Sequence, residues 1–205
     1  GEGPLSVRRL GDALHIRFND SLGNDDTVAA FDAALAEARG ARAIIVDLRD
    51  TPGGGNSNVA RAVMGWFVDR PLPYQHHELT AESRANGVRR SWIEEVSPRT
   101  GAPFPGRAIV LVGRWTGSMG EGIGVGFDAI GASVVGSRMA GLLGAIYDLP
   151  LPSSGLTLKL PAERLSHVNG TPREAFSPPT LVAYADAPDP NGRDLCLDAA
   201  LALVD

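Results

Sequence analysis

The sequence places one serine between glycines in the stretch Trp115-Thr-Gly-Ser-Met-Gly-Glu-Gly122. This stretch follows the apolar run Ala108-Ile-Val-Leu-Val112 and precedes a glycine-rich segment that can be helical. A serine at such a strand-to-helix turn can present its hydroxyl beside backbone N–H groups, which is the arrangement that acyl transfer needs. A tight turn in which Ser118 only caps the helix would have the same pattern. This segment alone leaves both interpretations open.

A second glycine-rich turn follows another predicted strand. Residues 41–48 form a near-continuous apolar run, typical of a buried parallel strand, and Arg49-Asp-Thr-Pro-Gly-Gly-Gly55 comes directly after it. Asn56 or Ser57 then caps an expected helix, at whose start unpaired N–H groups gather. The sequence of this turn matches neither the dinucleotide-binding nor the phosphate-loop glycine motif. The turn is therefore either a backbone donor for an oxyanion or simply a tight connection.

The first histidine, His15, lies in a predicted strand. Residues 12–19 alternate as a strand does, with Leu14, Ile16 and Phe18 on one face. The ring of His15 therefore points away from the apolar side of its strand. It is either a bystander or a base that faces a cleft.

The stretch from residue 70 to 106 breaks the apolar pattern, because prolines and charged residues interrupt it. We expect a functional flap or a disordered excursion here. His76 and His77 lie in it beside Glu78, and a metal site would need a third ligand at suitable spacing. We therefore expect exposed loop histidines, with Trp92 anchoring the loop to the core.

Apolar periodicity predicts the remaining elements. They are a helix after Asp25 that ends at Gly40, a glycine-bearing helix over 119–130, short strands over 132–136 and 145–149, a hairpin arm over 156–160, a turn-rich tract over 161–179, a strand over 180–184 and a helix over 194–204. The one cysteine, Cys196, follows the apolar pattern of the last helix, so we expect it in the core.

Composition indicates a single globular domain over residues 1–205. Of its 205 residues, 43% are hydrophobic and 21% are charged, which is enough for a sizeable core. The net charge is −5 and no dense basic stripe is present, so we expect no nucleic-acid partner. No apolar run reaches the length of a membrane span, and one cysteine excludes an internal disulfide. The compartment and the oligomeric state stay open.

The order of the motifs resembles that of the tail-specific serine peptidase family. Four features carry the resemblance: His15 in a strand, Asp47-Leu-Arg-Asp-Thr-Pro-Gly-Gly54, Thr116-Gly-Ser-Met-Gly-Glu121 and Asn169-Gly-Thr-Pro-Arg-Glu174. The family includes the C-terminal processing peptidases, the tricorn protease core and retinoid-binding-protein-like modules. The resemblance implies an α/β, crotonase-like fold of ββα repeats that acts on peptide or protein substrates. We see no PDZ module ahead of this core.

The resemblance also implies a nucleophile and an oxyanion hole. In that interpretation Ser118 attacks the substrate and forms an acyl-enzyme. The N–H groups of Met119 and of Gly53 or Gly54 hold the oxyanion, because the two glycine turns converge. No metal or organic cofactor is implied.

The tricorn-like branch of the family takes a histidine from the first strand and a glutamate from the late loop. His15 and Glu174 match those places, so the resemblance implies a triad of Ser118, His15 and Glu174. Such a triad is chemically reasonable, since a serine needs a base of near-neutral pKa whose tautomer a third group fixes. Asp47 and Arg49 are then structural residues that link the strand end to its neighbours.

The sequence departs from the family pattern in three places. The C-terminal processing branch uses a serine-lysine dyad, and Leu143 stands where that lysine should fall. Lys159, the only lysine, lies on an alternating strand elsewhere, so lysine-based catalysis is not expected. Leu14 replaces the hydroxyl residue that often precedes the histidine, and Phe176-Ser-Pro-Pro-Thr180 replaces the closing motif.

Two other functions stay open. An α/β-hydrolase-like esterase would use Ser118, Asp148 and His167 in that chain order, although Thr116 breaks the usual glycine-x-serine-x-glycine turn. A catalytically inactive member of the same fold would bind apolar ligands or partners. An inactive module would have no need of the set formed by His15, Ser118 and Glu174.

Overall fold

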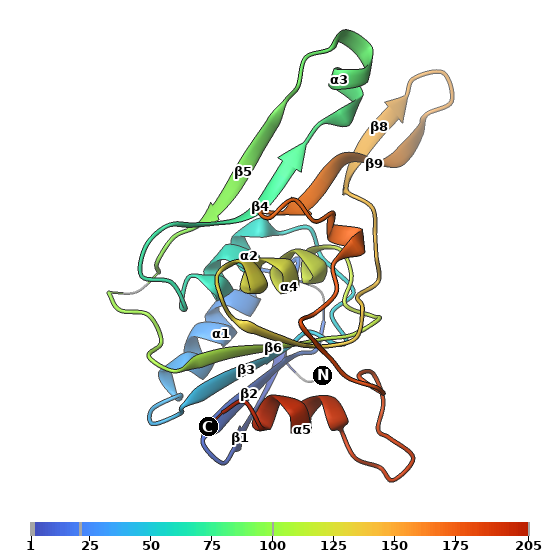
Figure 1. The fold of residues 1–205 in the computed structure, drawn as a ribbon. Coiled ribbons are helices and arrows are strands. Elements are labelled where there is room, and N and C mark those ends of the chain that lie inside the picture. The colour runs from blue at the N-terminus through green and yellow to red at the C-terminus, as the bar shows by residue number, and fades with distance from the viewer. Residues whose placement is uncertain (1–2, 21, 100, 205) are drawn as a thin grey trace.

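The computed structural model describes residues 3–20, 22–99 and 101–204, so both ends of the expected 1–205 domain lie outside the described residues. The described part has a mixed α/β fold with two sheets (Figure 1). The larger sheet has the order β1-β2-β3-β6-β7-β10. Its strands are β1 (Leu5–Leu10), β2 (Ala13–Phe18), β3 (Ala43–Asp47), β6 (Arg107–Val112), β7 (Ser133–Gly136) and β10 (Thr180–Leu181).

Strands β2, β3, β6, β7 and β10 run parallel to one another, and β1 pairs antiparallel to β2 at one edge. Helices connect or cover these strands: α1 (Asp26–Ala36), α2 (Ser57–Met64), α4 (Met119–Ala129) and α5 (Leu195–Leu201). The predicted elements of this core are confirmed, with ends that differ by a few residues. The Asn56 side chain caps α2, as expected, by accepting the Asn58 N–H at 3.0 Å.

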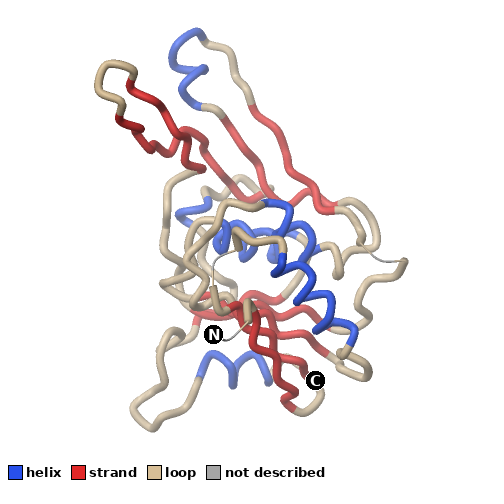
Figure 2. Tube along the Cα trace, turned by 180° about the vertical axis from the view of Figure 1, so that it is seen from behind, coloured by secondary structure: helices blue, strands red, loops and turns tan. Residues whose placement is uncertain are grey.

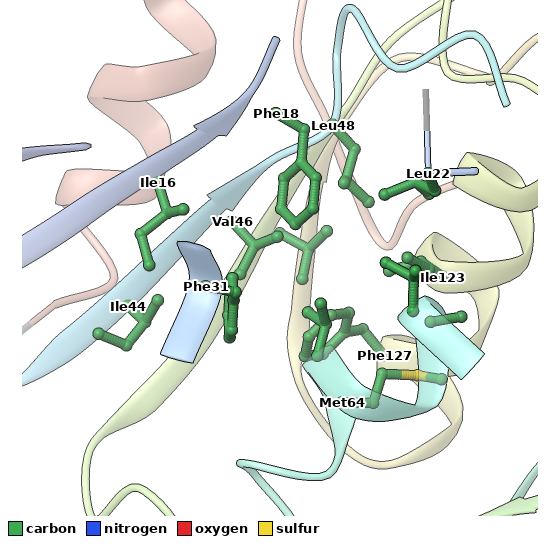
Figure 3. Packing of buried hydrophobic residues seen from close by; sticks show 14 of the residues in the cluster. Ile16, Phe18, Leu22, Phe31, Ile44, Val46, Leu48, Met64, Ile123 and Phe127 are labelled. Carbon is green, nitrogen blue, oxygen red and sulfur yellow. The ribbon is translucent and has the colours of Figure 1, made fainter. Parts of the chain in front are cut away.

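The two faces of the larger sheet have different partners, because side chains alternate along each strand. Ile16 and Phe18 of β2 face α1, α2 and α4, and pack in one core cluster with Phe31 (Figure 3). Ile45 of β3 faces the other way and packs with Cys196 of α5, which confirms the buried position of that cysteine. The side of the sheet on which a residue lies therefore decides which helix it can reach.

The smaller sheet has the order β5-β4-β9-β8, and its strands extend from the body as two arms (Figure 2). Its strands are β4 (Leu72–Glu78), β5 (Ser91–Val96), β8 (Ala145–Leu151) and β9 (Leu156–His167), with α3 (Thr80–Asn86) between β4 and β5. Residues 75–78 of β4 pair with 164–167 of β9, which joins the arms at their base.

The stretch from residue 70 to 106 is therefore more regular than expected. It contains two strands and a helix, and His77 is buried, so the expectation of an exposed loop histidine is wrong for that residue. Trp92 stacks on the His77 ring with 5.0 Å between ring centroids. These strands were not predicted from the sequence because many of their residues are polar, so they lack a regular apolar alternation. A bulge between Pro73 and Gln75 also interrupts the pairing of β4 with β5.

A network of charged residues on the α5 face fixes the end of β3. Asp47 is almost fully buried and accepts hydrogen bonds from His15 Nε2 at 3.0 Å and from Arg49. Arg49 also donates to Asp194, the residue at the start of α5, at 2.9 Å. The structural role expected for Asp47 and Arg49 is thus visible in these contacts.

No helix in the described part of the chain is long and apolar enough to cross a membrane.

We expect Asp47→Asn to lower the free energy of unfolding by about 3–5 kcal/mol at neutral pH, because it removes the buried carboxylate that pairs with the largely buried Arg49 guanidinium. Burial alone would raise the pKa of Asp47, but the hydrogen bonds from His15 and Arg49 outweigh it and hold that pKa well below its usual range. The stability from the ionised carboxylate is present above the unfolded pKa of about 3.9 and is lost below it. The difference between variant and wild type should therefore shrink as the pH falls below that value.

Denaturant unfolding over this pH range measures the difference. Asp50→Asn is the matched control, because the ion pair of Asp50 with Arg17 is about half exposed and contributes little. A difference that stays constant down to the lowest pH would contradict the role assigned to Asp47.

Candidate active site

The two glycine turns meet where the adjacent strands β3 and β6 end. Gly117 N–H donates to the Thr51 carbonyl at 2.9 Å, which joins one turn to the other. Gly53 has a φ of +145°, and a Cβ added to it would lie 2.8 Å from the Cβ of Ser118. Only glycine allows this approach. The expected convergence of the two turns is therefore present in the structure.

Ser118 has a backbone conformation that is unusual for a serine. Its φ is 48° and its ψ is −114°, whereas an ordinary N-cap residue is extended. A non-glycine residue in such a region costs about 1–3 kcal/mol and persists only where its surroundings hold it. A helix cap alone does not require this strain. The conformation therefore favours a role for the hydroxyl over simple capping.

Glu121 holds the Ser118 turn in place from inside the protein. Its carboxylate is fully buried and accepts the N–H groups of Ser118 at 2.8 Å, Gly141 at 2.8 Å and Leu142 at 3.2 Å. Burial raises the pKa of Glu121, and the Arg173 guanidinium and the three N–H donors oppose that rise. Glu121 thus ties the turn at Ser118 to the segment that leads into β8.

Arg173, in the short 3₁₀ helix η1 (Arg173–Ala175), completes this support. It is buried, and it donates to the carbonyls of Leu142 at 2.8 Å, Gly144 at 3.1 Å and Ser118 at 3.5 Å. Burial lowers the pKa of Arg173, while Glu121 and other carboxylates act in the opposite direction. Neither Glu121 nor Arg173 was predicted from the sequence to support the Ser118 turn. The signal that could have pointed to them is a charged residue within each of two motifs that consist mostly of small and turn-forming residues.

Ser118 opens into a cavity of about 400 Å³ between the core and the two arms. The floor of the cavity includes Met119 and Gly122 of α4 and Gly55 near the start of α2. Its outer wall comes from the smaller sheet, with His77 and Glu163 among the lining residues. A substrate bound here would lie against both the serine and the arms.

The structure does not bring His15 to Ser118. His15 lies on the α5 face of the sheet, where its Nε2 bonds to Asp47 and its Nδ1 accepts from Arg8 Nε at 3.1 Å. Ser118 is the N-cap residue of α4, which packs on the opposite face. The alternation that turns Leu14 and Ile16 toward α4 is what turns His15 away from it. That His15 acts as the base stays a prediction, and this arrangement does not support it.

The other residues singled out in the sequence are also separate from Ser118. Glu174 lies on η1 and lines a different hollow, together with Leu143 and Pro161. His167 Nε2 faces Asp128, near the end of α4, at 3.2 Å, and Asp148 pairs with Lys159 on the β8–β9 arm at 2.7 Å. The residues of the esterase alternative are therefore not assembled.

Comparison with known proteins identifies the family. The family model of peptidase family S41 matches residues 13–177, so the chain belongs to peptidase family S41. This confirms the resemblance to the tail-specific peptidases. No curated protein sequence matches the chain. In the described part of the chain, no group of three or more histidine, cysteine, aspartate or glutamate residues could hold a metal ion.

Solved structures share the fold at low sequence identity. A Parabacteroides merdae protein assigned as a peptidase has a TM-score of 0.83 and 20% identity, with 98% of this chain and 64% of that one covered. The photosystem II D1 C-terminal processing protease has a TM-score of 0.71 and 20% identity, covering 93% and 51%. The tricorn protease has a TM-score of 0.60 and 20% identity, covering 95% and 18%. The chain thus spans less than two thirds of each of these proteins.

The strain at Ser118 can be measured by substitution. We expect Ser118→Gly to be more stable than Ser118→Ala by about 1 kcal/mol, because glycine adopts a positive φ without penalty. Thermal or denaturant unfolding of the two variants measures the difference. The control pair is Ser83→Gly and Ser83→Ala in α3, where the order should reverse because glycine is the poorer helix former. Equal stability of the two Ser118 variants would mean that the conformation stores no strain.

Proposed function

We propose that the chain is a serine-type peptidase core with Ser118 as the nucleophile. Ser118 Oγ attacks the carbonyl carbon of a scissile peptide bond and forms an acyl-enzyme, which water then hydrolyses. The substrate is a peptide or protein that enters the cavity between the core and the arms. The observation that carries this proposal is the strained Ser118, held against Gly53 and open to that cavity.

We assign the oxyanion hole to backbone N–H groups of the two converging turns. Met119 is the first residue of α4, so its N–H is one of the four at the helix start without an intrahelical acceptor. Gly53 or Gly54 supplies the second donor from the facing turn. Each such donor contributes about 10²–10³ in rate in known acyl-transfer enzymes. The ββα repeat of a crotonase-like fold is the architecture that this convergence fits.

The identity of the general base is a separate question. The triad of Ser118, His15 and Glu174 stays a prediction from motif order, since only Ser118 of the three lines the cavity. If the chain were a binding module instead, the strain at Ser118 would have no chemical use. Reactivity of the serine distinguishes these two functions.

We expect a fluorophosphonate probe to label the chain at Ser118. Ser118→Ala should abolish labelling because the nucleophile is gone, and mass spectrometry of the labelled peptide locates the adduct. Gly53→Ala should lower the labelling rate by about 10²–10³, because its Cβ would push against Ser118 and misplace the oxyanion donor.

Ser154→Ala is the control for this experiment, because that exposed serine lies between β8 and β9, away from the cavity. Labelling of Ser118→Ala as strongly as wild type, or no labelling of a folded wild-type chain, would favour the binding module.

A further inference from the structure

His77 is the one histidine that shares the Ser118 cavity among the described residues. It lies on β4, two residues after Gln75 and on the same face of the strand. Gln75 Oε1 reaches α4, lying 3.1 Å from the Cβ position of Gly122, one turn after Ser118. The face of β4 that carries His77 is therefore turned toward the start of α4.

The hydrogen bonding of His77 leaves one ring nitrogen free. Nδ1 is bonded to the carboxylate of Glu163 on β9. An ionised carboxylate only accepts hydrogen bonds, so Nδ1 carries the proton, and the neutral ring then has its lone pair on Nε2. His77 Nε2 is buried and has no hydrogen-bond partner in the described part of the chain. This is the tautomer that a general base for a serine needs.

The carboxylates of Glu163 and Glu94 lie beside the His77 ring and are themselves held in place. Glu163 is itself held, since its Oε2 accepts the Tyr147 hydroxyl at 3.1 Å. Glu94 Oε1 lies 3.8 Å from His77 Nε2, beyond hydrogen-bond distance. The other oxygen of Glu94 accepts from Arg61 at 3.2 Å and from Tyr74, which fix that carboxylate in place. Two carboxylates therefore lie beside the ring, and neither forms a hydrogen bond with Nε2.

We propose that His77 is the general base for Ser118 and that Glu163 positions it, in a role that motif order gave to His15 and Glu174. The inference rests on the serine peptidase function proposed above. His77 Nε2 takes the proton from Ser118 Oγ as Oγ bonds to the scissile carbonyl carbon and the carbonyl π electrons move to oxygen. His77 then gives that proton to the leaving nitrogen as the carbon–nitrogen bond breaks.

The second half of the reaction reverses these roles. His77 takes a proton from the water that attacks the acyl carbon, and returns it to Ser118 Oγ as the ester bond breaks. Glu163 stays ionised throughout and keeps the ring in its tautomer. We expect the hydrogen bond between His77 Nε2 and Ser118 Oγ to form in the substrate complex, because catalytic hydrogen bonds commonly tighten only around bound substrate.

The test compares fluorophosphonate labelling rates of variants of the 205-residue chain. We expect His77→Ala to lower the rate by about 10²–10⁴, the usual contribution of a general base. His76→Ala is the matched control, because the neighbouring ring lies on the other face of β4 and does not line the cavity. Free imidazole should restore part of the labelling of His77→Ala, which a purely structural role would not allow.

The role of Glu163 has its own pair of variants. Glu163→Gln should slow labelling, and Glu163→Asp should recover part of the rate because it keeps a carboxylate acceptor. Circular dichroism and thermal melting check that each variant is folded, and His77→Gln replaces His77→Ala if that variant is not. A rate for His77→Gln equal to that of wild type would overturn the proposal as surely as the same result for His77→Ala.

The outcomes separate the two proposals. No labelling of folded wild type would remove the serine peptidase function and this inference with it. Labelling of wild type at Ser118 that His77→Ala leaves unchanged would overturn the role of His77 and keep the function. Loss of labelling in a folded His15→Gln variant, with His77→Ala unaffected, would return the base to the first strand.

Discussion

The close approach of two glycine turns is the constraint on which the rest of this structure depends. Parallel strands β3 and β6 are neighbours, so the turns that follow them emerge at one edge of the sheet. They can touch only because Gly53 has no side chain where Ser118 lies. Glu121 accepts the N–H of Ser118 and Arg173 donates to its carbonyl, and both side chains are buried beneath the turn. These contacts account for two charged residues in a buried position. Hydrogen bonds to backbone groups offset part of the cost of burying them.

Because side chains alternate along each strand, the buried ion network and the Ser118 cavity lie on opposite sides of the larger sheet. The buried ion network of Asp47 and Arg49 lies on the α5 face and anchors that helix through Asp194. Ser118 and its cavity lie on the side of α4 and the arms. His15 belongs to the first group because its Nε2 is already bonded to Asp47. Its Nδ1 accepts a hydrogen bond from Arg8 as well, so in this structure neither ring nitrogen of His15 is free to take a proton from Ser118.

The parallel core could be predicted from the sequence because its signals are local. Apolar runs give β3 and β6, glycine turns follow them, and capping residues such as Asn56 mark where helices begin. The arms could not be predicted in the same way. The strand β4 is polar, and its partner β9 lies about ninety residues further along the chain, so its pairing is non-local. The glycine turn that carries Ser118 was thus predictable, whereas the surroundings of His77 were not.

Motif order along the chain does not by itself assign the base. Order along the chain identifies a family, because related chains share the succession of their elements. It does not say toward which face of a strand a side chain turns, and a shift of one residue reverses that face. The contact of His77 with Glu163 exists only because β4 and β9 pair at one register. A buried imidazole nitrogen without a partner is costly, and such groups call for a specific explanation. The proposed role as the base for Ser118, which lines the same cavity, would give His77 Nε2 a partner.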